Sequence, residues 1–184
     1  MNKTMLASTL LCGSALAMTG CQTVQSQMQT GNPFSQPALK STINSVDDNK
    51  EMGQIFLRPV DEGVQIYGKL MNLEPNTTVS LHIHETGSCA DMGQAAGGHF
   101  NPDNNDHSNP DDINGHAGDL PNMTANENGI ATINYVNKEI SSADSGKYSV
   151  NRLAFIVHDG ADDYTSQPAG DAGERIACGI IEKN

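Results

Sequence analysis

The sequence predicts an all-β domain, a Greek-key flattened β-barrel or sandwich of about eight antiparallel strands that carries long loops. Three observations support this fold class. Apolar and polar residues alternate along short segments, turn residues separate these segments, and no amphipathic helix of useful length is apparent. Aromatic residues make up only 4% and Trp is absent, so the core must be built from Val, Ile, Leu and Ala.

The N-terminal residues 1–20 are typical of a signal peptide, because Lys3 precedes an apolar stretch too short for a membrane span. The sequence Met18-Thr19-Gly20-Cys21 resembles a bacterial lipobox, in which the cysteine becomes the acylated first residue. Plain signal cleavage is the alternative. Residues 21–39 are polar and predict a lipid-anchored flexible tether, and residues 40–184 form the predicted folded domain.

Two cysteines are left for the folded domain, because Cys12 leaves with the leader and Cys21 would carry the lipid. An exported protein folds in an oxidising compartment, which favours one disulfide between Cys89 and Cys178. Two buried free thiols are the alternative.

Alternating apolar residues predict the strands in order, and turn residues at Pro59–Gly63 and Glu74–Thr77 separate the first three. The predicted strands are Ile55–Leu57, Val64–Leu70, Val79–His84, Ile130–Val136, Arg152–His158 and Glu174–Ile181. Between them, Glu85–Asn122 is far longer than an ordinary connection and is rich in Gly, Asn, Asp and Pro. Such a loop buries too little apolar surface to offset its ordering entropy, so a bound metal is expected to hold it.

The histidines are placed as metal ligands would be. His82 and His84 stand two apart on a predicted strand, so both side chains point to the same face. His99 follows two glycines, whose missing Cβ atoms let the backbone pass close to a buried site. The remaining candidates are His107, His116, Asp119 and His158. Imidazole with carboxylate suits zinc, and a nitrogen-rich set suits copper.

Five motifs together are similar to those of the bacterial copper/zinc superoxide dismutase family, over the chain from about Val46 onward. They are HIHETGSC at His82–Cys89, AAGGHF at Ala95–Phe100, GHAGDLP at Gly115–Pro121, IVHDGADDY at Ile156–Tyr164 and ERIACGII at Glu174–Ile181. The resemblance implies that the long loops are metal-binding and active-site loops. It also implies one copper and one zinc per subunit.

The resemblance further implies a role for each matching residue. The implied copper ligands are His82, His84, His99 and His158; the implied zinc ligands are His99, His107, His116 and Asp119, with His99 shared. Asp162 would support a ligand of each metal, Arg175 would attract the substrate anion, and His99 would also deliver a proton. Cys89 and Cys178 match the family disulfide. For Arg175 taken alone, a surface ion pair with Glu174 or a nearby Asp is the alternative.

The implied reaction is the disproportionation of superoxide to oxygen and hydrogen peroxide, which would protect the cell envelope. The net charge of −12 excludes nucleic acid as a partner and leaves the lipid at Cys21 as the only membrane contact. We expect a periplasmic or cell-envelope protein, anchored as an outer-membrane lipoprotein. A homodimer is one of the oligomeric states that the sequence leaves open.

An acidic protein should repel an anionic substrate, so a positive field is needed near the copper. The segment Asp159–Glu174 contains no Lys, which leaves Arg175 with Lys147 or Arg152 as candidate sources. Alternatives for the whole chain are a copper or zinc store on the same scaffold, a copper-only relative, and a calcium site near Asp103–Asp112. The last lacks the EF-hand spacing, and the copper-only reading conflicts with the intact zinc set.

Overall fold

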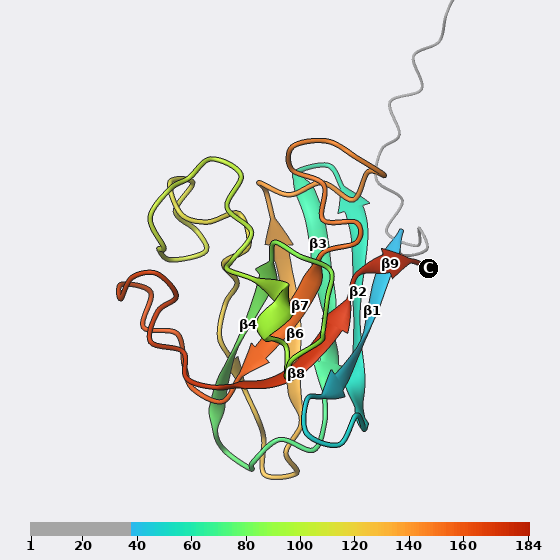
Figure 1. The fold of residues 1–184 in the computed structure, drawn as a ribbon, viewed down its shortest axis with the longest axis vertical. Coiled ribbons are helices and arrows are strands. Elements are labelled where there is room, and N and C mark those ends of the chain that lie inside the picture. The colour runs from blue at the N-terminus through green and yellow to red at the C-terminus, as the bar shows by residue number, and fades with distance from the viewer. Residues whose placement is uncertain (1–37) are drawn as a thin grey trace, which may run out of the picture.

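The strands of the protein form one strongly curved sheet that closes almost completely into a flattened barrel (Figure 1). The structure is a computed structural model that describes residues 38–184. The predicted signal peptide, Cys21 and the tether as far as residue 37 lie outside these residues. No helix within the described part has the length and apolarity of a membrane span.

Eight strands follow one another around the barrel in the order β5-β4-β7-β8-β1-β2-β3-β6, and β9 pairs with the first two residues of β1. Their bounds are β1 Leu39–Ser45, β2 Glu51–Val60, β3 Gly63–Leu70, β4 Thr78–His84, β5 Met123–Thr124, β6 Ala131–Asn137, β7 Ala154–His158, β8 Arg175–Ile180 and β9 Glu182–Lys183. All pairings are antiparallel, and β5 lies against β6 to close the barrel. The all-β Greek-key prediction is therefore confirmed.

One apolar core fills the barrel, and it comes from the inward-facing residues of every main strand. On β2, for example, Ile55 and Leu57 are completely buried, whereas the side chain of Gln54 points outward and is exposed. Strands β4 and β7 differ, because nearly every residue in them is buried. Their inner faces meet the core and their outer faces lie beneath the long loops.

A second, smaller apolar cluster lies outside the barrel, where Ala96, Ile156 and Cys178 pack with Val46 and Cys89. Cys89 and Cys178 form a disulfide that ties the loop after β4 to strand β8. Their Cα atoms are 5.7 Å apart, an ordinary separation for a disulfide. The disulfide therefore anchors the beginning of the loop that carries His99.

We predict that replacing both Cys89 and Cys178 by serine lowers the free energy of unfolding by about 4 to 5 kcal/mol, because their disulfide closes a loop across 89 residues of sequence. Urea denaturation with and without a thiol reductant measures this. The reductant should lower the midpoint of the wild-type protein and leave that of the double variant unchanged. Equal wild-type midpoints under both conditions would contradict the prediction.

Candidate metal centre

Three of the six histidines are carried by two neighbouring strands. The pleat of β4 turns Leu81 and Ile83 into the core and places His82 and His84 on the outer face. His158 ends strand β7, directly opposite Ser80 in the β4–β7 register. Backbone pairing of the two strands therefore fixes the positions from which these three imidazoles extend.

His99 reaches the same place from the long loop. It forms an isolated β-bridge with His84, and the Phe100 N–H donates to the Ile83 carbonyl at 2.8 Å. Glu85 holds the loop from both sides: its N–H donates to Gly98 O, and its Oε1 accepts the Gly98 N–H at 3.1 Å. A Cβ on Gly97, where φ is 77°, would lie 2.6 Å from Glu85 Oε1, so this close approach requires glycine.

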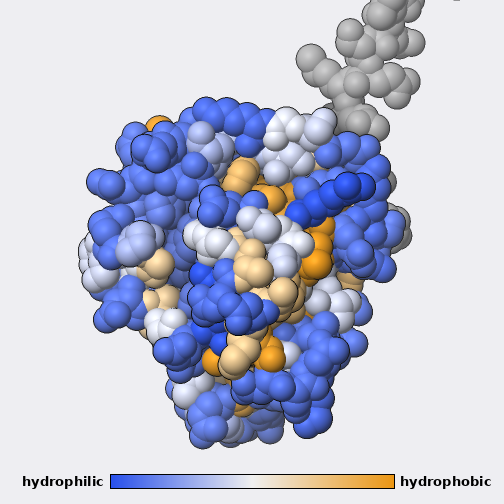
Figure 2. Space-filling model, viewed as in Figure 1, coloured by the Kyte–Doolittle hydropathy of each residue, from blue (hydrophilic) through white to orange (hydrophobic). Residues whose placement is uncertain are grey.

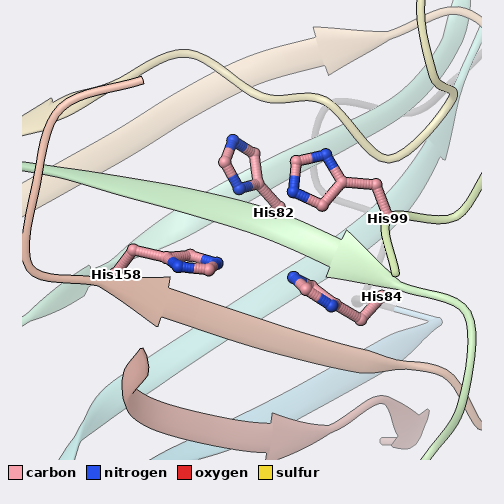
Figure 3. A group of neighbouring side chains, drawn as sticks. All are labelled: His82, His84, His99 and His158. Atoms are coloured by element: carbon pink, nitrogen blue, oxygen red, sulfur yellow. The ribbon is translucent and has the colours of Figure 1, made fainter. Parts of the chain in front are cut away.

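The four rings turn one unpartnered nitrogen each toward a common centre (Figure 3). These buried atoms are His82 Nδ1, His84 Nε2, His99 Nε2 and His158 Nε2. The other nitrogen of each ring is engaged, for example His84 Nδ1 donates to Gly97 O at 2.9 Å and His158 Nδ1 to Gly173 O at 3.2 Å. A neutral imidazole that donates through one nitrogen carries a lone pair on the other. Four converging nitrogen lone pairs fit a copper ion.

A second group lies on the other side of His99 and consists of His99, His107, His116 and Asp119. The Asp119 carboxylate is its centre, with Oδ1 2.8 Å from His99 Nδ1 and Oδ2 3.0 Å from His107 Nδ1. His116 Nδ1 lies 3.4 Å from both Asp119 Oδ1 and His99 Nδ1. Three imidazole nitrogens and one carboxylate within 4.8 Å fit a zinc ion.

Asp162 connects the two groups, because its carboxylate contacts one histidine of each. Its Oδ2 accepts a hydrogen bond from His82 Nε2 at 2.8 Å, and its Oδ1 accepts one from His107 Nε2 at 2.9 Å. Asn122 holds the backbone of Asp162 with both ends of its carboxamide, each at 2.9 Å. Asp162 thereby fixes which nitrogen of each ring carries the proton.

Burial dominates the ionisation of the strand histidines. It lowers the pKa of His82 to about 3, that of His84 to about 2 and that of His158 to about 4. These rings are therefore neutral at ordinary pH, as metal binding requires. Burial also acts on His107, but its hydrogen bonds to Asp119 and Asp162 outweigh it and raise the pKa to about 9. Both carboxylates have lowered pKa values, because hydrogen bonds from histidines outweigh their burial.

A cleft of about 580 Å³ opens over the first group, and His84, His99, His158 and Arg175 line it. The guanidinium of Arg175 donates to the carbonyls of Gly93 at 2.5 Å and Gly97 at 2.7 Å. Among the described residues it forms no ion pair, so the alternative pairing with Glu174 is not made. Its charge therefore faces the cleft without a neutralising carboxylate.

The other two candidate sources of positive field lie elsewhere. Lys147 is paired with Asp103 at 2.5 Å on the surface, and neither Lys147 nor Arg152 lines the cleft. Acidic residues do line it, namely Glu85 and Asp106. Within the cleft lining Arg175 is the only Lys or Arg.

The sequence predicted the seven ligand residues of the two groups and also Asp162, which connects the groups. The structure brings these eight residues together. Sequence reasoning missed the polar side chains that hold the loops: Glu85, Asn122, Tyr164 and Gln167. Tyr164 accepts the Asn122 N–H at 2.9 Å, which adds a second contact between the two loops. The only sequence signal for these residues is their position inside the motifs or next to them.

Known proteins resemble this chain over most of the described residues. The family model "Copper/zinc superoxide dismutase (SODC)" matches residues 51–181. A copper-zinc superoxide dismutase of Francisella tularensis is 39% identical over 147 residues, which cover 76% of this chain and 77% of the relative. One from Aquifex aeolicus is 36% identical and covers 78% and 88%. The crystal structure of a double mutant of a SOD-like protein from Bacillus subtilis has a TM-score of 0.72 at 34% identity, covering 78% and 96%.

We predict that the metal-free protein loses stability when the pH falls from 6.5 to 5.0. The folded pKa values of His82, His84 and His158 lie far below the unfolded value of 6.5, so the unfolded chain binds more protons in this interval. The cost per group rises to about 1.4 kcal/mol per pH unit as the unfolded histidine becomes fully protonated toward pH 5.0. His107 contributes a nearly constant stabilisation in this interval. Its pKa is raised in the folded protein, so its stabilising effect is already complete below the pKa of the unfolded chain.

Urea midpoints of the chelator-treated protein at both pH values measure this loss. Burial also lowers the pKa of His99, so His158→Gln removes one of four such groups and should make the slope shallower without abolishing it. Midpoints that stay the same between the two pH values would show that these rings already carry protons in the folded state.

Proposed function

The chain belongs to the copper/zinc superoxide dismutase family, and on this premise we propose that its two groups of ligands form a single catalytic centre joined by His99. Members of this family are enzymes that use copper and zinc and disproportionate superoxide. The protein is accordingly a superoxide dismutase, which converts two superoxide ions and two protons into oxygen and hydrogen peroxide.

The position of His99 is the observation that carries the proposal. Its Nε2 is the unpartnered atom on the copper side, and its Nδ1 lies among the zinc ligands, 2.8 Å from Asp119. We assign copper to His82, His84, His99 and His158, and zinc to His99, His107, His116 and Asp119. Bound copper supplies the exchange of one electron with superoxide, and bound zinc supplies a fixed positive charge beside it.

The residues of the chain bind the substrate and manage its proton. Arg175 attracts superoxide into the cleft, because its donors are fixed by two carbonyl groups and its charge is not neutralised. The ring of His99 lines the same cleft, and its Nε2 is the atom that can hold a proton for the peroxide product. The other three copper-side rings each donate to a backbone carbonyl or to Asp162, which fixes their orientation.

We also propose that the enzyme works in the cell envelope, against superoxide formed outside the cytoplasm. The Cys89–Cys178 disulfide supports this location, because such bonds persist in oxidising compartments. The predicted leader and the acylated Cys21 would supply the route and the outer-membrane anchor.

Three alanine variants test the bridge. His158→Ala should lose copper and keep zinc, His116→Ala should lose zinc and keep most of the copper, and His99→Ala should lose both. Elemental analysis of the purified proteins, with an assay of superoxide removal, distinguishes them. A His99→Ala protein that keeps a full equivalent of zinc would rule out the shared ligand.

We predict that Arg175→Ala lowers the rate of superoxide removal by about tenfold or more, since it removes the unpaired cation of the cleft. Arg152→Ala is the matched control, because it removes the same charge outside the cleft. Rates measured at several ionic strengths report the field. Added salt should slow the wild-type enzyme relative to Arg175→Ala. Equal losses in both variants would show that only the net charge matters.

A further inference from the structure

We propose that Gln167 is a positioning residue for the zinc ligand His107, so that zinc is retained only while the segment 159–174 is closed over the zinc loop. This inference rests on the zinc site proposed above. It concerns how the ligand is held, which the comparisons with relatives do not address.

His107 differs from its neighbours in how its backbone is held. His99 is bridged to His84, and the His116 carbonyl accepts the Asp119 N–H at 3.0 Å in a tight turn. Within residues 38–184, His107 makes no hydrogen bond to any other backbone group, and it lies in neither a strand nor a turn. Something other than regular structure must therefore fix the Cα position from which its ring extends.

The carboxamide of Gln167 supplies both missing contacts. The His107 N–H donates to Gln167 Oε1 at 2.8 Å, and Gln167 Nε2 donates to the His107 carbonyl at 2.8 Å. One residue of a β-strand offers its neighbour the same pair of donor and acceptor. Gln167 thus acts as a side-chain substitute for a strand partner, across 60 residues of sequence.

The ring of His107 depends on the same segment. Its Nε2 is held by Asp162 Oδ1, and a Cβ on Gly170, where φ is 69°, would lie 2.7 Å from that nitrogen and 1.8 Å from that oxygen. Segment 159–174 therefore contacts both the backbone and the ring of His107, while Asp119 faces the remaining nitrogen. If the segment moves away, His107 loses the hydrogen bonds of its backbone and of Nε2, and keeps only Asp119 and the packing of its ring against neighbouring histidines.

Gln167 is itself held in place by a closed turn. The Asp163 carboxylate accepts the N–H groups of Thr165 and Ser166, each at 2.8 Å. The Gly170 N–H donates to Ser166 O at 2.7 Å, and the Asp163 N–H donates to Gly170 O at 2.9 Å. The turn presents the Gln167 side chain to the zinc loop in a fixed position.

The test is zinc release from the metal-loaded chain, followed with a zinc-selective chromophoric chelator. Gln167→Glu keeps the acceptor, removes the donor and places a carboxylate against the His107 carbonyl. We expect release at least about tenfold faster than from the wild type, the range seen when outer contacts of metal ligands are lost. Gln54→Glu, an exposed residue of β2 with the same charge change, should leave the rate unchanged.

The charge of the new glutamate makes the outcome decisive. If Gln167 acted only through the electrostatic field, an added negative charge would slow zinc release, whereas loss of the donor speeds it. Gln167→Ala removes both contacts without adding charge and should also release zinc faster. Cobalt(II) bound in place of zinc gives an independent signal, since its visible spectrum should shift in both Gln167 variants and not in Gln54→Glu.

Unchanged release and unchanged cobalt spectra in both Gln167 variants would overturn the role of Gln167 while leaving the dismutase centre intact. The role of Gln167 would also be overturned if its variants released zinc faster only in proportion to a loss of folding stability in the metal-free protein. Gln167 would then stabilise the whole fold and not His107 in particular. A wild-type chain that retains no zinc would instead overturn the zinc site, and this proposal with it.

Discussion

The contact on which the rest of the centre depends is the pair of hydrogen bonds that Asp162 accepts from His82 and His107. An ionised carboxylate offers a strong acceptor on each oxygen, and the histidine donors lower the pKa of Asp162 against the effect of its burial. Because each ring donates to Asp162 through Nε2, the Nδ1 lone pair of each is turned toward its own metal group. One side chain therefore sets the orientation of a ligand in both groups.

The two groups are built by different means, and this difference follows from the chain. Strands β4 and β7 supply three of the four copper-side rings, and these strands are held by backbone pairing and by the buried core. The zinc side comes from a loop with little apolar surface, which polar contacts hold at separate points. Tyr135 on β6 donates to the Pro110 carbonyl, Asn137 donates to the Ala117 carbonyl, and Gln167 holds His107. The copper side is thus fixed by the fold, and the zinc side by closure of the loop.

The apolar pattern of the sequence predicted β2, β3, β4, β6, β7 and β8. Apolar residues recur at a period of two in the first four, whereas β7 is a continuous apolar run. The pattern missed β1, where the residue buried between Leu39 and Ile43 is the small polar Ser41. It also missed β5 and β9, which are two-residue strands that exist only through their partners.

The ligand residues could be proposed because they stand in motifs that resemble those of the family, and the structure brings them together in space. The loop contacts could not. A carboxamide such as that of Gln167 finds its partner 60 residues away, and nothing in the local sequence encodes that distance. The same holds for Asn122 and Asp162, which are 40 residues apart.

An acidic protein can act on an anionic substrate if its unpaired positive charge lies at the active site, and most of its lysine charges are paired with carboxylates elsewhere. Several lysines sit beside carboxylates: Lys147 against Asp103, and Lys183 against Asp144. A cation next to a carboxylate contributes little field at a distance, because the pair acts as a dipole and salt screens it. Arg175 differs, since its guanidinium donates to two neutral carbonyls and keeps its full charge at the cleft. The cleft lining also contains Glu85 and Asp106, so the attraction for superoxide depends on where the unpaired guanidinium lies and not on an excess of positive charge in the cleft.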